Sequence, residues 1–263
     1  MSQVAVQMYT VRNHTKTVKD LVETLRKISK IGYQAIQAGA FPFMTGESPE
    51  MTAADLRKLL DDHGIRCVAT HSSWESLVNE TEKEIEFHEA LDCDYTAIGM
   101  IPKPYQDKGA SAFRQFISDA EPVIRRLKKA GIRFGYHNHA YEFLRDKDGT
   151  RPIDVLVNEG GPGLMMEVDT YWVAHAGGNP TAFLKRCAGR IDVIHVKDKV
   201  MVDRKESFFA PIGEGNLEWD EIIAAARAGG CEWHCVEQDL TWNDRDPFDC
   251  LRSSFEFLTG KGL

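Results

Sequence analysis

Short apolar runs alternate with amphipathic stretches along the whole chain. Each run has the length of a strand that is buried on both faces, as the strands of a parallel sheet are. The pattern predicts eight strands, at Val4–Met8, Tyr33–Gln37, Ile65–Thr70, Tyr95–Met100, Ile132–His137, Leu164–Val168, Ile191–Val196 and Cys231–Glu237.

Helical patterns fill the intervals between these runs. They predict helices at Val18–Ile31, Ala53–His63, Glu82–Leu91, Phe113–Ala130, Thr181–Cys187, Leu217–Ala228 and Phe248–Leu258, with a weaker one over residues 151–159. Gly32, Gly64 and Gly131 stand between a helix and the next strand, where a left-handed backbone ends a helix. Eight strand–helix units predict an α/β fold, a (β/α)₈ TIM barrel that forms a single domain over residues 1–263. No glycine-rich phosphate-binding motif follows the first strand, which argues against a nucleotide-binding sheet.

Composition narrows the class of protein. A formal net charge of -8 disfavours a nucleic-acid partner. The six cysteines form no CxxC motif and are typical of reduced thiols in a cytoplasmic protein. The first residues resemble a strand more than a signal peptide, and no apolar run reaches the ~20 residues of a membrane span. We therefore expect a cytoplasmic protein without a membrane or nucleic-acid partner, with a homo-oligomer as one option.

Polar side chains follow nearly every predicted strand. In a TIM barrel these positions converge on one pocket at the carboxyl ends of the strands. The residues are Gln7, Gln37, His71, His137, His139, Glu142, Glu167, Asp169, His195, Lys197, Glu237 and Asp239.

Four of these residues have the spacing of a metal site. Glu142, Asp169 and His195 are separated by about one strand–helix unit each, and Glu237 follows after a long loop. Three carboxylates and one imidazole suit one divalent ion, Mn²⁺, Mg²⁺, Co²⁺ or Zn²⁺, with Mn²⁺ as the first choice. A single carboxylate such as Asp169 is more often a helix cap, but four such residues on four consecutive strands favour a metal site. Glu142 lies beyond its strand, so His137, His139 and Glu167 are its substitutes.

Several motifs together resemble the xylose-isomerase-like TIM barrels, and within them the sugar phosphate isomerase/epimerase group. The motifs are Val6–Arg12, Gly135-Tyr136-His137-Asn138-His139-Ala140-Tyr141-Glu142-Phe143, Val168-Asp169-Thr170-Tyr171-Trp172-Val173, His195-Val196-Lys197-Asp198, Gly213-Glu214-Gly215 and Val236-Glu237-Gln238-Asp239. The resemblance implies a divalent metal held by Glu142, Asp169, His195 and Glu237. It also implies that Glu142 and Glu237 are the catalytic acid and base, as in the family's ketose 3-epimerases.

The expected activity is isomerisation or epimerisation of a small sugar or keto-sugar, by removal of a proton next to a carbonyl. Lys197, His71 and His139 are expected to hold substrate hydroxyls or to stabilise negative charge, with Trp172 and Phe41 as apolar walls. Gln7 and His137 complete the expected substrate contacts. The segment Phe208–Gly215 is a candidate lid whose amides are able to bind phosphate.

Other functions stay open at this stage. This chain has Tyr136-His137-Asn138-His139 where the ketose 3-epimerases have a glutamate at the end of strand five, and Trp172 where they have a histidine. The His-x-His pattern is closer to inosose dehydratase and keto-sugar lyase relatives, so a lyase or dehydratase acting on an inosose, keto-sugar or 3-keto-glycoside is the alternative. A DNA-repair endonuclease of the endonuclease IV type and a non-catalytic sugar- or protein-binding barrel are further alternatives.

Overall fold

Eight parallel strands form the centre of the described part of the chain, which comprises residues 3–46, 48–241 and 244–263 of a computed structural model. These strands are β1 (Val4–Gln7), β2 (Ala35–Ala38), β3 (Arg66–His71), β4 (Tyr95–Ile98), β5 (Arg133–His137), β6 (Leu164–Glu167), β7 (Val193–Val196) and β10 (Trp233–Val236). They are hydrogen-bonded in the order β6-β5-β4-β3-β2-β1-β10-β7. A parallel bridge between Asp169 and His195 joins the two ends of this order and closes the barrel. The predicted TIM barrel is confirmed.

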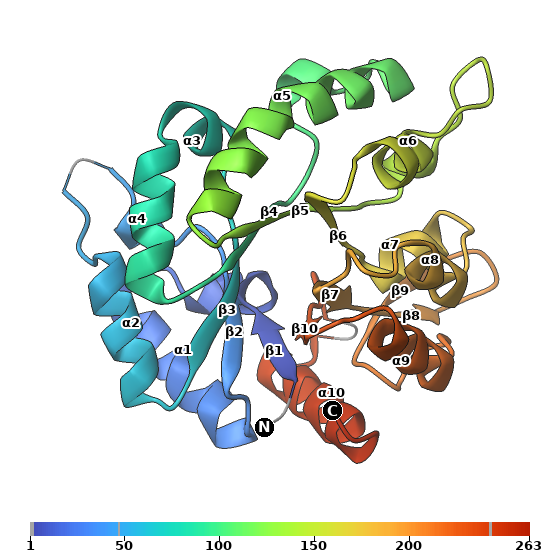
Figure 1. Cartoon of the computed structure of the whole chain (residues 1–263). Coiled ribbons are helices and arrows are strands. Elements are labelled where there is room, and N and C mark those ends of the chain that lie inside the picture. Colours follow the sequence, from blue (N-terminus) through green and yellow to red (C-terminus); the bar gives the residue numbers. More distant parts are fainter. Residues whose placement is uncertain (1–2, 47, 242–243) are drawn as a thin grey trace.

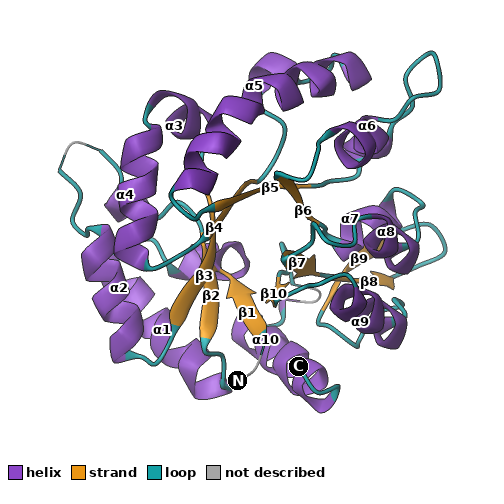
Figure 2. Cartoon of the chain, in the orientation of Figure 1, coloured by secondary structure: helices purple, strands orange, loops and turns teal. Residues whose placement is uncertain are grey.

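Helices surround the ring of strands (Figures 1 and 2). They are α1 (Val18–Ile31), α2 (Ala53–Asp62), α3 (Trp74–Asn79), α4 (Thr81–Leu91), α5 (Gly109–Lys129), α6 (Pro152–Glu159), α7 (Thr170–His175), α8 (Pro180–Arg186), α9 (Trp219–Ala228) and α10 (Pro247–Gly260). Short 3₁₀ segments follow β1, β2, β4 and β5, at Met8–His14, Pro42–Met44, Lys103–Tyr105 and Tyr141–Phe143. None of the helices built from the described residues has the length and apolar character needed to cross a membrane.

Local sequence sets the ends of the helices. Thr17 and Thr52 each form a capping box with an aspartate three residues later, which satisfies free amides at the starts of α1 and α2. Gly32 ends α1 at φ 125°, and a Cβ there would lie 2.6 Å from the ring of Phe255. The tight turn below β2 therefore requires glycine on both steric and conformational grounds.

The barrel has two apolar layers, because successive strand residues point to opposite faces. The inner layer is small and includes Ala5, Ala35, Ala69, Ala97 and Tyr95. The larger outer layer lies between strands and helices and contains most of the buried leucine, isoleucine and phenylalanine. Small residues inside the barrel leave the polar side chains at its carboxyl end close to the axis.

The long segment after β7 contains a hairpin that the sequence pattern did not reveal. Strands β8 (Asp198–Met201) and β9 (Ser207–Ala210) pair antiparallel. Asp198, fully buried, accepts hydrogen bonds from the amides of Gly213 (2.9 Å) and Gly215 (3.1 Å) and from Trp219 Nε1 (2.7 Å). The glycine amides considered as a phosphate site therefore bind a side chain of the protein itself.

Candidate active site

Four side chains that could hold a metal ion meet at the carboxyl end of the barrel. His137 ends β5, Asp169 follows β6, His195 lies in β7 and Glu237 follows β10. One ligand atom from each of these buried residues lies within 4.8 Å of the others. We call this group the four-residue cluster. Its two imidazoles and two carboxylates are donors that divalent transition metals accept.

Neighbouring groups fix the orientation of Asp169. One carboxylate oxygen, Oδ1, accepts the amide of Trp172 at 2.9 Å and caps α7. The other, Oδ2, faces His137 Nε2 at 3.4 Å. The backbone amide of Asp169 donates to Asn138 Oδ1 at 3.1 Å. Asp169 is thus both a helix cap and a member of the cluster, the two functions that the sequence presented as alternatives.

Lys197 places an ammonium group against the same carboxylates. Its Nζ lies 2.7 Å from Asp239 Oδ1, 3.2 Å from Glu237 Oε2 and 3.6 Å from Asp169 Oδ2. Burial opposes a charge on Lys197, but Glu237, Asp169 and Asp239 raise the pKa of its ammonium above the usual value. Burial likewise opposes ionisation of Glu237, yet Lys197 and His195 hold the pKa of that carboxyl well below its usual range. The cluster therefore contains ionised carboxylates that need positive charge around them.

A second group, the three-residue cluster, consists of His71, Glu167 and His195. Glu167 Oε2 lies 2.5 Å from His71 Nε2 and 3.2 Å from His195 Nε2, and Glu167 Oε1 accepts Gln37 Nε2 at 2.7 Å. His195 Nε2 also contacts Gln37 Oε1 at 2.7 Å, while its Nδ1 faces Glu237 Oε2 at 3.0 Å. Against the effect of burial, His195 and His71 hold the pKa of Glu167 at about 2. His195 therefore joins the two clusters through its two ring nitrogens.

Glu142 is a member of neither cluster. It lies in the 3₁₀ turn after β5, where Oε1 accepts Tyr136 Oη at 2.7 Å and Oε2 accepts the amide of His139 at 2.9 Å. Burial raises the pKa of its carboxyl to about 7. The turn directs Glu142 back toward Tyr136, and His137, one of the named substitutes, occupies the position among the cluster that the spacing assigned to Glu142.

Two buried polar atoms beside the clusters have no hydrogen-bond partner in the described residues. They are His139 Nδ1 and Trp172 Nε1, and the centroids of the two rings lie 5.3 Å apart. Burial and the neighbouring His137 lower the pKa of His139 to about 3. A neutral imidazole and an indole N–H without partners are suited to bind substrate oxygen atoms.

A cleft of about 520 Å³ opens onto the clusters. Of the expected substrate contacts, its lining includes Gln7, Phe41, His71, His137, His139, Lys197 and Glu237. Trp172 lies behind this lining, with its ring 5.2 Å from Lys197 Nζ. Arg12 and Asp239 also line the cleft. Asp239 was visible as a polar residue after the last strand. Arg12 belongs to the motif Val6–Arg12 but was not among the expected substrate contacts.

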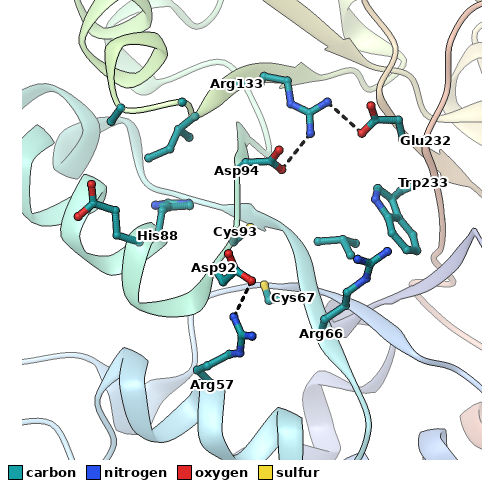
Figure 3. A pocket seen from close by; sticks show the side chains of 15 residues that line it. Arg57, Arg66, Cys67, His88, Asp92, Cys93, Asp94, Arg133, Glu232 and Trp233 are labelled. Atoms are coloured by element: carbon teal, nitrogen blue, oxygen red, sulfur yellow. Dashed lines mark hydrogen bonds and ion pairs between the residues drawn. The ribbon is translucent and has the colours of Figure 1, made fainter.

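A larger cavity of about 810 Å³ lies at the opposite end of the barrel, where the strands begin (Figure 3). Arg133 binds Asp94 at 2.9 Å and Glu232 at 3.0 Å, and Arg57 binds Asp92 at 2.9 Å. These charges neutralise one another across the cavity. In TIM barrels this end contributes to stability, whereas chemistry occurs at the carboxyl end.

Comparisons of the sequence and the structure with known proteins support the TIM-barrel fold. Residues 25–259 match the family model described as "Xylose isomerase-like TIM barrel". The rhizopine catabolism protein MocC of Rhizobium meliloti is 23% identical over an alignment of 274 positions, which covers 90% of this chain and 80% of MocC. A sugar phosphate isomerase/epimerase from Parabacteroides distasonis superposes with a TM-score of 0.78 at 20% identity, over 98% of this chain and 94% of that one. The probable 3-DHS dehydratase AsbF of Bacillus anthracis superposes with a TM-score of 0.71 at 14% identity, over 98% of this chain and 99% of AsbF.

Proposed function

Because the chain belongs to the xylose isomerase-like TIM barrel family, we propose that it is a divalent-metal-dependent isomerase or epimerase of a small sugar or keto-sugar. The reaction begins with removal of a proton next to a carbonyl group. The observation that carries the proposal is the four-residue cluster, in which buried imidazole and carboxylate donors converge at the floor of a cleft.

The donor set fits one divalent ion, with Mn²⁺ as the first choice. We propose His137, Asp169, His195 and Glu237 as its ligands, with His137 in place of Glu142. The contact of Lys197 with Glu237 and Asp169 supports the fit, because these carboxylates already attract a cation. When bound, the ion would polarise the substrate carbonyl and so make the neighbouring C–H bond more acidic.

The chain's own residues have distinct functions in the proposed step. Glu237 is ionised beside Lys197 and His195, so it is in the state that accepts a proton. The ammonium of Lys197 stabilises negative charge that develops on the substrate oxygen. His139 lines the cleft and its Nδ1 has no partner in the described residues, so we assign it to bind a substrate oxygen, while the ring of Trp172 packs behind it.

Proton exchange with solvent tests the proposal directly. The protein is treated with a chelator, Mn²⁺ is restored, and ketoses, inososes and 3-keto-glycosides are followed by proton NMR in D₂O. We expect metal-dependent deuterium incorporation next to a carbonyl and accumulation of an isomeric sugar. Glu237→Gln is expected to reduce the rate about 10²- to 10⁴-fold. If no compound exchanges a proton with the Mn²⁺-loaded protein, the proposal is refuted.

A lyase or dehydratase is the second candidate, because its first step uses the same cleft and the same proton acceptor. The fold is shared with a probable dehydratase as well as with an isomerase/epimerase, so fold does not separate the two. In the same NMR experiment, loss of water or of an aglycone in place of an isomeric product identifies the lyase.

A further inference from the structure

Two cysteines line the cavity at the start of the barrel strands, which the proposed function does not use (Figure 3). Cys67 is the second residue of β3, and Cys93 lies two residues before β4. Both are almost buried, at 3% and 5% exposure, and both belong to the lining of the cavity. The cavity has a volume of about 810 Å³, which leaves room for a small reagent to reach the two sulfur atoms. We call these two residues the thiol pair.

The pairing of β3 with β4 places the two cysteines side by side. The two strands are parallel, and Thr70 lies opposite Thr96. Counting back three residues along both segments in the same register brings Cys67 opposite Cys93, and both side chains belong to the outer apolar layer. Neighbouring strands lie about 4.7–4.9 Å apart, and a disulfide requires Cα atoms about 4.4–6.8 Å apart. The register therefore gives the thiol pair the separation of a disulfide.

The two thiols also interact with each other, with opposite effects on their acidity. Contact with Cys93, with a contribution from Arg57, lowers the pKa of the Cys67 thiol against the effect of burial. The same contact, burial and the nearby Asp94 raise the pKa of Cys93 well above its ordinary value. At Cys231, which is 6% exposed, burial is the main influence and raises the pKa of the thiol. Since the thiolate is the reactive form, Cys67 is the nucleophile of the pair.

A metal site is the main alternative for two adjacent thiols, but it lacks ligands. A structural zinc site needs four ligand atoms. Within the described ranges of the chain, no third metal-binding atom gathers with the thiol pair. His88 lines the same cavity, but its ring nitrogens contact Thr70 Oγ1 at 2.7 Å and the carbonyl oxygen of Glu84 at 2.6 Å. Each thiol therefore has the other as its reaction partner.

We propose that Cys67 and Cys93 form a redox-active pair, a modification site that a peroxide converts to a reversible disulfide. The inference is independent of the proposed function. The Cys67 thiolate attacks one oxygen of the peroxide, the O–O bond breaks, and the sulfur becomes a sulfenic acid while the other oxygen leaves as water. Cys93 then attacks that sulfur, forms the S–S bond and releases a second water. Two thiols and one hydrogen peroxide thus give one disulfide and two waters, with the sulfurs oxidised and the peroxide reduced.

The experiment exposes the reduced, chelator-treated wild type briefly to hydrogen peroxide. The remaining thiols are then alkylated in denaturant, and the unreduced protein is digested with trypsin, which cleaves after Arg66 and Lys83 and so separates the two cysteines. We expect mass spectrometry to detect the Cys67 and Cys93 peptides joined, with a loss of two hydrogens. Dithiothreitol should separate them, and the other four cysteines should be alkylated.

Serine variants identify the sulfur that reacts first. In Cys93→Ser, Cys67 should accumulate as a sulfenic acid and react with dimedone, at least about tenfold more than Cys93 does in Cys67→Ser. The control Cys231→Ser keeps both members of the thiol pair, and it should form the disulfide as the wild type does.

The wild-type result decides the proposal without any variant. If both thiols survive the peroxide, or if links to other cysteines form as readily, the proposal is overturned. Equal labelling by dimedone in Cys93→Ser and Cys67→Ser would overturn the assignment of Cys67 as the nucleophile.

Discussion

Buried charges of opposite sign determine the properties of single residues around the cleft. The carboxylates of Glu167, Asp169 and Glu237 are almost inaccessible, and each faces a lysine or a histidine. An isolated buried charge would be strongly unfavourable, so each of these groups depends on its neighbours. Replacement of one member leaves its partner as an uncompensated buried charge, so it is expected to destabilise the fold as well as to impair binding and chemistry.

His234 predicts a pH dependence of stability away from these clusters. It is fully buried in β10, its Nε2 has no partner in the described residues, and Nδ1 lies 4.0 Å from Cys231 Sγ. Burial, with a small contribution from Arg227, lowers its pKa to about 4. The unfolded chain binds a proton there below about pH 6.5 while the folded chain does not, so stability is complete above that pH and falls toward pH 4.

The test is urea denaturation of the wild type and His234→Leu at pH 7 and pH 5. Between pH 7 and pH 5, we expect the free energy of unfolding to fall by about 2 kcal/mol more in the wild type than in the variant. This difference follows because pH 5 lies about 1.5 units below the pKa of an unfolded histidine, and each unit corresponds to about 1.4 kcal/mol. Equal losses in the two proteins would show that His234 is not responsible.

The residues that the sequence identified correctly as neighbours share one property. Asp169, His195 and Glu237 each lie at the end of a barrel strand, where topology alone brings side chains together. Glu142 lies beyond a strand end, in a turn whose direction depends on its bonds to Tyr136 and His139. Spacing along the chain predicts which unit a residue belongs to, but it does not predict how a turn directs the side chain.

At the scale of elements, the periodicity of apolar residues was sufficient to predict the barrel strands and most of the helices. The short helices α3 and α7 and the hairpin β8–β9 were missed. Both helices are only six residues long, too short for a periodic pattern, and the hairpin is held by tertiary contacts. Asp169 caps α7 while facing the cluster, and Asp198 binds the loop after β9. An aspartate with several long-range amide partners has no periodic signature, so pattern analysis does not find it.

Replacement of Asp198 tests whether its contacts hold the loop after the hairpin. Asp198→Ala leaves the amides of Gly213 and Gly215 and the indole N–H of Trp219 without their acceptor, in a buried position. We expect the free energy of unfolding to fall by about 3 kcal/mol, measured by urea denaturation. Asp203→Ala removes an exposed acceptor of the Lys205 and Glu206 amides in the turn of the same hairpin, and it should lower the free energy of unfolding by only about 1 kcal/mol or less. Equal effects of the two changes would contradict the account of the loop.

At the proposed metal site, binding of an ion would be coupled to folding of the whole barrel. The proposed ligands come from β5, β7 and the segments after β6 and β10, so they are brought together only in the closed barrel. An ion that binds the folded chain alone stabilises it, by about 2.7 kcal/mol at 100 times its dissociation constant.

For a domain of this size that stabilisation corresponds to an increase in Tm of about 5–10 °C. Calorimetric scans with Mn²⁺ and with excess chelator should differ by this amount in the wild type. The difference should disappear in Asp169→Asn, which removes charge from a proposed ligand. A Tm that is independent of Mn²⁺ would mean that no ion binds the folded barrel tightly.

The most direct test of the central claim is a calorimetric titration of the chelator-treated protein with Mn²⁺, together with His137→Ala and Glu142→Gln. The account predicts one ion per wild-type chain, an affinity reduced about 100-fold or more in His137→Ala, and an unchanged affinity in Glu142→Gln. Absence of binding to the wild type, or loss of binding in Glu142→Gln with retention in His137→Ala, would contradict the proposed metal site.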